Sequence, residues 1–216
     1  MRLGELSDVS ATSPASIKFY LREGLLDAGE RVNPTRASYG EQHVRRLRLI
    51  SGLRSVVELG LPDIRRIIRA AEGADDSPER RLALLATVQS VVLGLGEERP
   101  GASPAVDALL QEMGWPAAPS EARTAVDDHL AEMAAVGATV DQTTLAVYGR
   151  AADLIADAQL AATDTRVELE DFILTAAVGM HMHHRLILKL IGLAQASHSI
   201  RRYGSRPVST KKPGPS

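Results

Sequence analysis

The stretch "SPASIKFYLREGLL" at residues 13–26 concentrates side chains that bind phosphate. Lys18 and Arg22 lie four residues apart, so on a helix they share one face. Tyr20 carries a hydroxyl that can bond to a phosphate or a base edge, and Ser16 is small enough to let a base approach closely. The pattern predicts contact with nucleic acid through a short cationic helix.

Basic and turn-forming residues continue after this stretch. "LLDAGERVNPTRASYG" predicts a hairpin or wing, and the helix that follows carries a ridge of arginines. Further candidate DNA contacts are Arg31, Asn33, Arg36, Tyr39, Arg45 and Arg48. Other interpretations remain open, because Phe19 and Tyr20 can instead be core residues that tie the helix to the wing. A run of charges is also often only a solvated helix face.

Two short helices must position the cationic side chains. Residues 3–9 place apolar side chains at a spacing of three, which is typical of one helical face. Ser13 suits the N-cap and Pro14 the first position of a second helix, which we expect to run to about Glu23. Two short helices joined by a tight turn are typical of a helix-turn-helix, whose second helix enters the major groove of DNA.

The net charge of −2 conceals an asymmetry along the chain. Residues 1–71 carry a net charge of +4, residues 72–199 carry −11, and residues 200–216 carry +5. An acidic body repels nucleic acid, so DNA contacts are expected at the front end.

The rest of the chain is predicted to be helical, and the fold class is mostly α. From Ser77 onward a near-heptad pattern favours a dimer or interdomain helix, with an apolar stripe of Leu82, Leu85, Val88, Val92 and Leu95. Later helical patterns cover about 104–113, 120–136, 141–162 and 168–198, with Gly179 or Gly192 as candidate breaks. The expected parts are a winged-helix DNA-binding domain at 1–71, a linking or dimerisation helix at 77–96, a helical effector-binding or dimerisation domain at 103–200, and a disordered basic tail at 201–216.

Larger, adaptable side chains in the C-terminal half are candidates for an effector pocket. They are Trp115, Met133, Tyr148, Phe172, Met180, His181 and His184. Methionines and aromatics at helical spacing belong to a core more often than to a ligand site. His181 and His184 are three residues apart and share a face that could bind a metal, but a polar helix face or a dimer interface is the favoured interpretation. We expect no metal and no cofactor.

Several functional classes are disfavoured. The chain has no cysteine, which excludes disulfides, thiolate metal sites and cysteine nucleophiles. It shows no apolar signal core, and no apolar run approaches the ~20 residues of a membrane helix, so we expect a cytoplasmic protein with no membrane partner. We do not expect an enzyme, because the sequence has no nucleophile–base motif, no phosphate loop and no carboxylate pair more specific than chance.

The first 71 residues resemble the MerR family of transcription regulators. The resemblance rests on "LGELSDVSATSPASIKFYLREGLL", "GERVNPTRASYGEQHVRRLRLI" and "LGLPDIRRII", in this order and spacing. It implies a winged-helix DNA-binding domain with two supporting helices, a homodimer held by the helix that follows, and a variable C-terminal effector domain. Members of the family bind pseudo-palindromic promoter sites, where many activate transcription by distorting the DNA and some only repress. RNA polymerase is therefore a further candidate partner.

We therefore expect a homodimeric, sequence-specific transcription regulator that binds double-stranded promoter DNA. A small-molecule effector in the C-terminal helical domain is expected to control it, and that domain is similar, at the level of fold, to the ligand-binding domain of TetR-type regulators. The alternative is a ligand-independent architectural or partner-recruiting DNA-binding protein whose C-terminal helices only oligomerise. A cavity in the helical part favours the first hypothesis, and a filled bundle favours the second.

Overall fold

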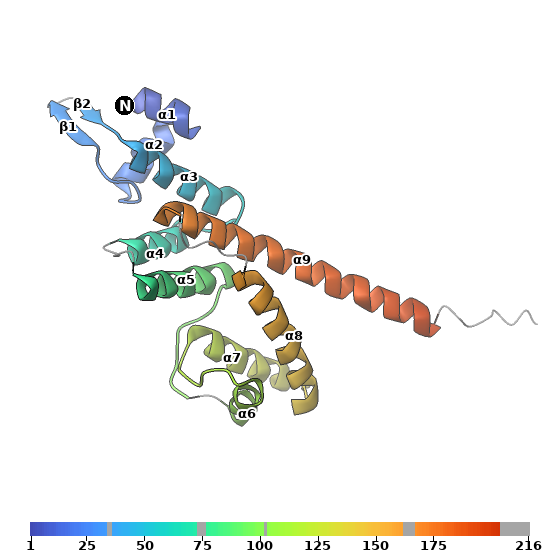
Figure 1. Cartoon of the computed structure of the whole chain (residues 1–216). Coiled ribbons are helices and arrows are strands. Elements are labelled where there is room, and N and C mark those ends of the chain that lie inside the picture. The colour runs from blue at the N-terminus through green and yellow to red at the C-terminus, as the bar shows by residue number, and fades with distance from the viewer. Residues whose placement is uncertain (34–35, 73–76, 102, 162–166, 204–216) are drawn as a thin grey trace, which may run out of the picture.

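The computed structural model describes residues 1–33, 36–72, 77–101, 103–161 and 167–203. It is mostly helical with one β-hairpin, as predicted (Figure 1). The front end contains α1 (Leu3–Ser10), α2 (Pro14–Arg22), β1 (Glu30–Asn33), β2 (Arg36–Ser38), α3 (Glu41–Ser55) and α4 (Leu61–Ala71). The rest contains α5 (Pro78–Leu93), α6 (Pro104–Met113), α7 (Glu121–Ala135), α8 (Gln142–Ala161) and α9 (Leu169–Tyr203).

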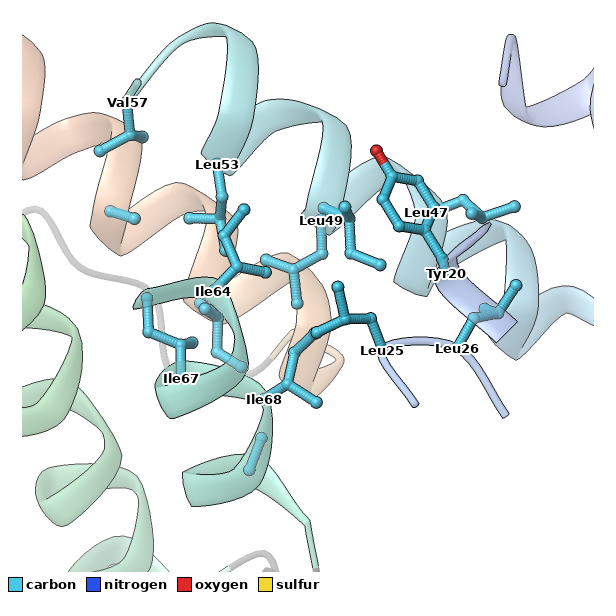
Figure 2. Close-up of a cluster of buried hydrophobic side chains, with 14 of the residues drawn as sticks. Tyr20, Leu25, Leu26, Leu47, Leu49, Leu53, Val57, Ile64, Ile67 and Ile68 are labelled. Carbon is cyan, nitrogen blue, oxygen red and sulfur yellow. The ribbon is translucent and has the colours of Figure 1, made fainter. Parts of the chain in front are cut away.

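The front-end helices pack around one apolar core. Leu6 of α1, Ile17 of α2 and Ile50 of α3 are fully buried. From α4, Ile64 and Ile67 enter the same core, as three-residue spacing on one helical face allows. Figure 2 shows side chains from α2, α3 and α4, and from the turn after α2, gathered in this cluster. Each fully buried aliphatic side chain contributes about 1.5–3 kcal/mol, so the core holds the helix-turn-helix in place.

The apolar side of α5 packs within its own chain, against α4 and α9. Its buried stripe consists of Leu84, Val88 and Val91, spaced by four and three residues. Of the near-heptad stripe predicted for a dimer or interdomain helix, Val88 is fully buried, Leu85 and Val92 are partly buried, and Leu82 is 68% exposed. The face buried within the chain therefore matches the predicted stripe only in part, and a role of this helix in a dimer stays a prediction. The heptad pattern reveals an amphipathic helix, but the intramolecular partners decide which face of it is buried.

Helices α6, α7 and α8 form a second helical group. Gly149 of α8 lies so close to α6 that an added Cβ would stand 2.8 Å from Leu109 Cδ1. The Trp115 indole N–H, just after α6, donates a 2.7 Å hydrogen bond to Asp153 of α8. This group also contacts the front end, because Arg66 of α4 pairs with Glu121 of α7 at 2.6 Å.

The last helix, α9, is 35 residues long and continuous, without the break expected near Gly179 or Gly192. Its first half packs on α3 and α5, and its second half extends away from the other helices (Figure 1). The helix continues to Tyr203, so it includes the first residues of the predicted tail, and residues 204–216 lie outside the described part. Within the described ranges, no helix combines the length and apolar character needed to cross a bilayer.

Candidate nucleic-acid interface

The turn between α1 and α2 is held by local hydrogen bonds. Ala11 adopts a left-handed conformation with φ of 51°, and the Thr12 backbone N–H donates to the Ser7 carbonyl at 3.2 Å. Ser13 caps α2 as predicted, because its hydroxyl accepts a 3.1 Å hydrogen bond from the Ser16 backbone N–H. The predicted exit also holds, since Gly24 has φ of +68°. The α1–turn–α2 unit is the expected helix-turn-helix.

The side chains of α2 divide between core and solvent. Lys18 and Arg22 are exposed, and Ser16 is half-buried, at the N-terminal end of the helix. Tyr20 is buried, because only 8% of the residue is exposed and its ring packs in the apolar core (Figure 2), so its expected contact with DNA stays a prediction beside the alternative of a core residue. Phe19 is partly buried beside it and supports Arg22, whose guanidinium carbon lies 5.3 Å from the ring centroid.

The predicted wing is an antiparallel hairpin. Its strands pair Arg31 with Ala37 and Asn33 with Arg36, so the last pair stands at the tip. Arg31 is exposed. The side chains of Asn33 and Arg36, both predicted to contact DNA, lie outside the described residues, although their backbones belong to the strands.

Tyr39 follows the hairpin and is buried, and its expected contact with DNA stays a prediction. Its ring packs edge-on against that of His43 at a centroid distance of 5.2 Å. The backbone N–H of Tyr39 donates to the Met1 carbonyl at 2.9 Å. Tyr39 therefore anchors the hairpin to α3 and to the start of the chain, which is a structural role.

The arginine ridge of α3 is largely occupied by acidic residues at the start of α9. Arg45 lies 3.8 Å from the Glu168 carboxylate and Arg46 lies 3.4 Å from that of Glu170. The Arg46–Glu170 pair is the more sheltered, with side chains only 17% and 20% exposed. Arg45, predicted to contact DNA, is thus engaged by the protein's own carboxylates, and the sequence could not reveal partners more than 120 residues away.

Four of the predicted cations remain on the front-end surface. The exposed cations are Lys18, Arg22, Arg31 and Arg48, and of these Arg22 lies 3.8 Å from the Glu23 carboxylate. An ion pair that the sequence did not indicate supports the end of α2, where Arg65 of α4 reaches the Glu23 carboxylate at 3.1 Å. Four cations presented by α2, the hairpin and α3 suit a polyanion, because each can neutralise one phosphate.

A cleft of about 250 Å³ lies between α5, α8 and α9. Its walls are mostly apolar, with Leu85, Leu160 and Met180 among them. Polar groups are added by Gln89, Gln159, Thr175, His183 and His184. Partial burial, followed by the neighbouring His183 and His181, holds the pKa of His184 below its ordinary value, so this imidazole favours its neutral form.

Only two of the predicted effector-pocket residues, Met180 and His184, line this cleft. Phe172 is instead a core residue beneath Arg81, and Trp115 is bonded to Asp153. Elsewhere lie Met133 on α7, Tyr148 exposed on α8, and His181 beside Arg185 on α9. The prediction selected large side chains, whereas the cleft lies between three helices and is lined mostly by other residues of those helices. Among the residues that the structure describes, no cluster of three or more His, Cys, Asp or Glu could hold a metal ion.

Comparison with known proteins identifies the front end. Residues 1–71 match the model of the MerR helix-turn-helix family of regulatory proteins. A crystal structure of the "putative transcriptional regulator SCO5550" from Streptomyces coelicolor A3(2) is 31% identical, with a TM-score of 0.60, and the match covers 96% of this chain and 100% of that one. No curated protein matches the chain. This chain therefore belongs to the MerR family and is a DNA-binding transcription regulator with an N-terminal helix-turn-helix domain.

Proposed function

We propose that the protein acts as a homodimer, that it contacts promoter DNA through Lys18, Arg22, Arg31 and Arg48, and that a small molecule in the α5–α8–α9 cleft controls it. RNA polymerase is the further partner expected at the promoter. One observation supports the control step above all: α9 forms one wall of the cleft and, at its start, pairs with the arginines of α3. A ligand that moves α9 relative to α5 thereby also moves it relative to the DNA-binding front end.

The cationic surface supports the DNA-binding part of the proposal. The exposed cations come from three different elements, so they can reach phosphates on either side of an inserted α2. The Ser13 cap closes the first turn of α2, and the Arg65–Glu23 ion pair ties the end of α2 to α4. Residues that hold the helix rigidly keep its cations in register with the DNA backbone.

The DNA surface is tested by fluorescence anisotropy of a labelled duplex at several salt concentrations. Each of Lys18→Ala, Arg22→Ala and Arg48→Ala is expected to weaken binding and to reduce the slope of log K against log salt by about 1. Arg150→Ala is the control, because this exposed arginine pairs with Glu112 in the α6–α8 group at 2.8 Å. Unchanged affinity in all three front-end variants would overturn the surface assignment.

The cleft supports the effector part. Its mainly apolar walls with a few amides, a hydroxyl and imidazoles suit a compact organic molecule with polar substituents. Its volume is slightly below the usual ~300–1,000 Å³ of ligand pockets, which favours a small ligand. Such a molecule shifts the equilibrium between DNA-competent and incompetent forms only if it binds one of them more tightly.

The cleft is tested by filling it. An added Cβ at Gly179 meets nothing within 4 Å, so Gly179→Leu is expected to place a side chain in the cleft without disturbing the fold. Gly192→Leu is the matched control, since that glycine is also unobstructed on α9 but does not line the cleft. Compounds that raise the Tm of wild type should leave the Tm of Gly179→Leu unchanged and should raise the Tm of Gly192→Leu as much as that of wild type. Equal responses of both variants would refute the site.

A further inference from the structure

The second half of α9, residues 182–203, leaves a long apolar stripe uncovered. Leu186, Leu190, Leu193 and Ile200 follow one another at intervals of four, three and seven residues, so they lie on one face of the helix. Each of them is 51–69% exposed. Within the described part of the chain, α9 has no buried residue after Ala177. An apolar face of this length is unusual on the surface of a monomer.

A second uncovered stripe runs along α8. Val147, Ala151, Leu154 and Ala158 are spaced by four, three and four residues and are all exposed. Leu154 is 73% exposed and Val147 is 50% exposed. The two alanines leave room for the larger leucines of another helix, and the four–three spacing matches that of α9.

The two helical segments carry opposite charge. From Phe172 to Tyr203 the sequence has no Asp or Glu, but it has three arginines and one lysine. Residues 121–161, which span α7 and α8, have seven Asp or Glu and only two arginines. By helical spacing, Lys189 borders the α9 stripe and Asp157 borders the α8 stripe, so packing the stripes together also brings unlike charges together.

Among the residues that the structure describes, the two stripes do not pack on each other within one chain. The main packing partner of α8 is α6, and the second half of α9 extends away from that group (Figure 1). We propose that a second copy of the chain joins them: the second half of each α9 packs on the α8 stripe of the other protomer. This rests on the homodimer of the proposed function and names its interface. The buried stripe of α5, Leu84, Val88 and Val91, is already covered within the chain, where α5 packs on α4 and α9.

The size of the interface is sufficient. The 22 residues of the α9 segment span ~33 Å, and a helix is ~10 Å wide, so one helix face covers ~330 Å². The 20 residues of α8 span ~30 Å, so two-fold symmetry makes each protomer contribute one α9 face and one α8 face, together ~630 Å². Standard-size interfaces bury ~600–1,000 Å² per partner, so this area lies at the lower end of that range. An anionic lipid surface would account for the cationic α9 but would repel the acidic α8, so a second copy explains both stripes.

Sedimentation velocity without DNA or effector tests this interface separately from the proposed function. Wild type is expected to be a dimer, and Leu190→Gln and Leu154→Gln should each weaken dimerisation at least tenfold. Leu188→Gln is the matched control, because Leu188 is 70% exposed on the opposite side of α9, and it should leave the dimer intact. If both stripe variants dimerise as tightly as wild type, the proposal is overturned. A wild-type protein that sediments as a monomer also overturns it, whether or not that monomer binds anionic vesicles.

Cysteine cross-linking tests the pairing of helices, since the chain has no native cysteine. A Leu190→Cys variant mixed with a Leu154→Cys variant is expected to give covalent heterodimers with a short bismaleimide linker. Leu190→Cys alone should give few cross-links. Efficient cross-linking of Leu190→Cys to itself, without the mixed product, would show that the two α9 helices pair with each other and would refute the assignment to α8.

Discussion

Replacing Gly52 with alanine tests the contact between the DNA-binding front end and α9. Gly52 lies in α3, and an added Cβ would overlap Leu174 Cδ1 of α9 and would stand 3.5 Å from Leu174 Cγ and Cδ2. The absence of a side chain at Gly52 is therefore what lets the two helices approach closely. Alanine must displace either Leu174 or the whole of α9.

Two opposing effects set the size of the change. Overpacking a tight contact costs about 1–3 kcal/mol. Alanine in a helix interior is favoured over glycine by about 1 kcal/mol, which offsets part of that cost. The net effect of Gly52→Ala is a destabilisation of about 0–2 kcal/mol. Gly192→Ala, at a position where an added Cβ meets nothing within 4 Å, should instead stabilise the protein by up to about 1 kcal/mol.

The measurement is thermal and urea unfolding of the two variants and of wild type. At about 2–4 °C per kcal/mol for a chain of this size, the Tm values of Gly52→Ala and Gly192→Ala should differ by roughly 2–12 °C. Combining Gly52→Ala with Leu174→Ala removes the obstruction, so in that background the glycine replacement should become neutral or stabilising. If Gly52→Ala stabilises wild type as much as Gly192→Ala does, the close α3–α9 contact is refuted.

Three further predictions follow. Arg45 lies 3.7 Å from the Glu41 carboxylate and 3.8 Å from that of Glu168, so the double variant Glu41→Gln/Glu168→Gln should release it for phosphate. The salt dependence of duplex binding, measured by anisotropy, should then steepen by about 0.9, and an unchanged slope would show that Arg45 faces away from DNA. The pKa of His184 is lower in the folded protein than its ordinary value of 6.5, so the unfolded chain binds a proton at this residue first as the pH falls. The contribution of His184 to the free energy of unfolding is therefore present above pH 6.5 and is lost as the pH falls through its pKa in the folded protein. Unfolding free energies between pH 7 and 5 should therefore decline less in His184→Gln than in wild type, and parallel curves would contradict this. Ala11→Gly should raise the free energy of unfolding by about 0.5–1 kcal/mol, because glycine adopts the left-handed conformation of this turn without strain. Chemical denaturation measures the change, and an unchanged free energy of unfolding would show that Ala11 is not strained.

Features that depend on neighbouring residues could be predicted from the sequence. Ser13 and Pro14 start α2 where expected, and Gly24 ends it in a left-handed conformation. Helices α6 to α9 begin within one residue of their predicted positions. Capping, φ preferences and apolar periodicity act over one or two turns, so these signals are complete in the local sequence.

The sequence by itself thus determined the elements, the helix-turn-helix and the exposed cations Lys18 and Arg22. Only the tertiary structure decided that Tyr20 is buried and that Arg45 is paired with Glu168. It also decided which face of α5 is covered and where the cleft lies. These features depend on which elements, far apart in the chain, pack against each other. Side-chain periodicity identifies an apolar face but does not indicate which element covers it.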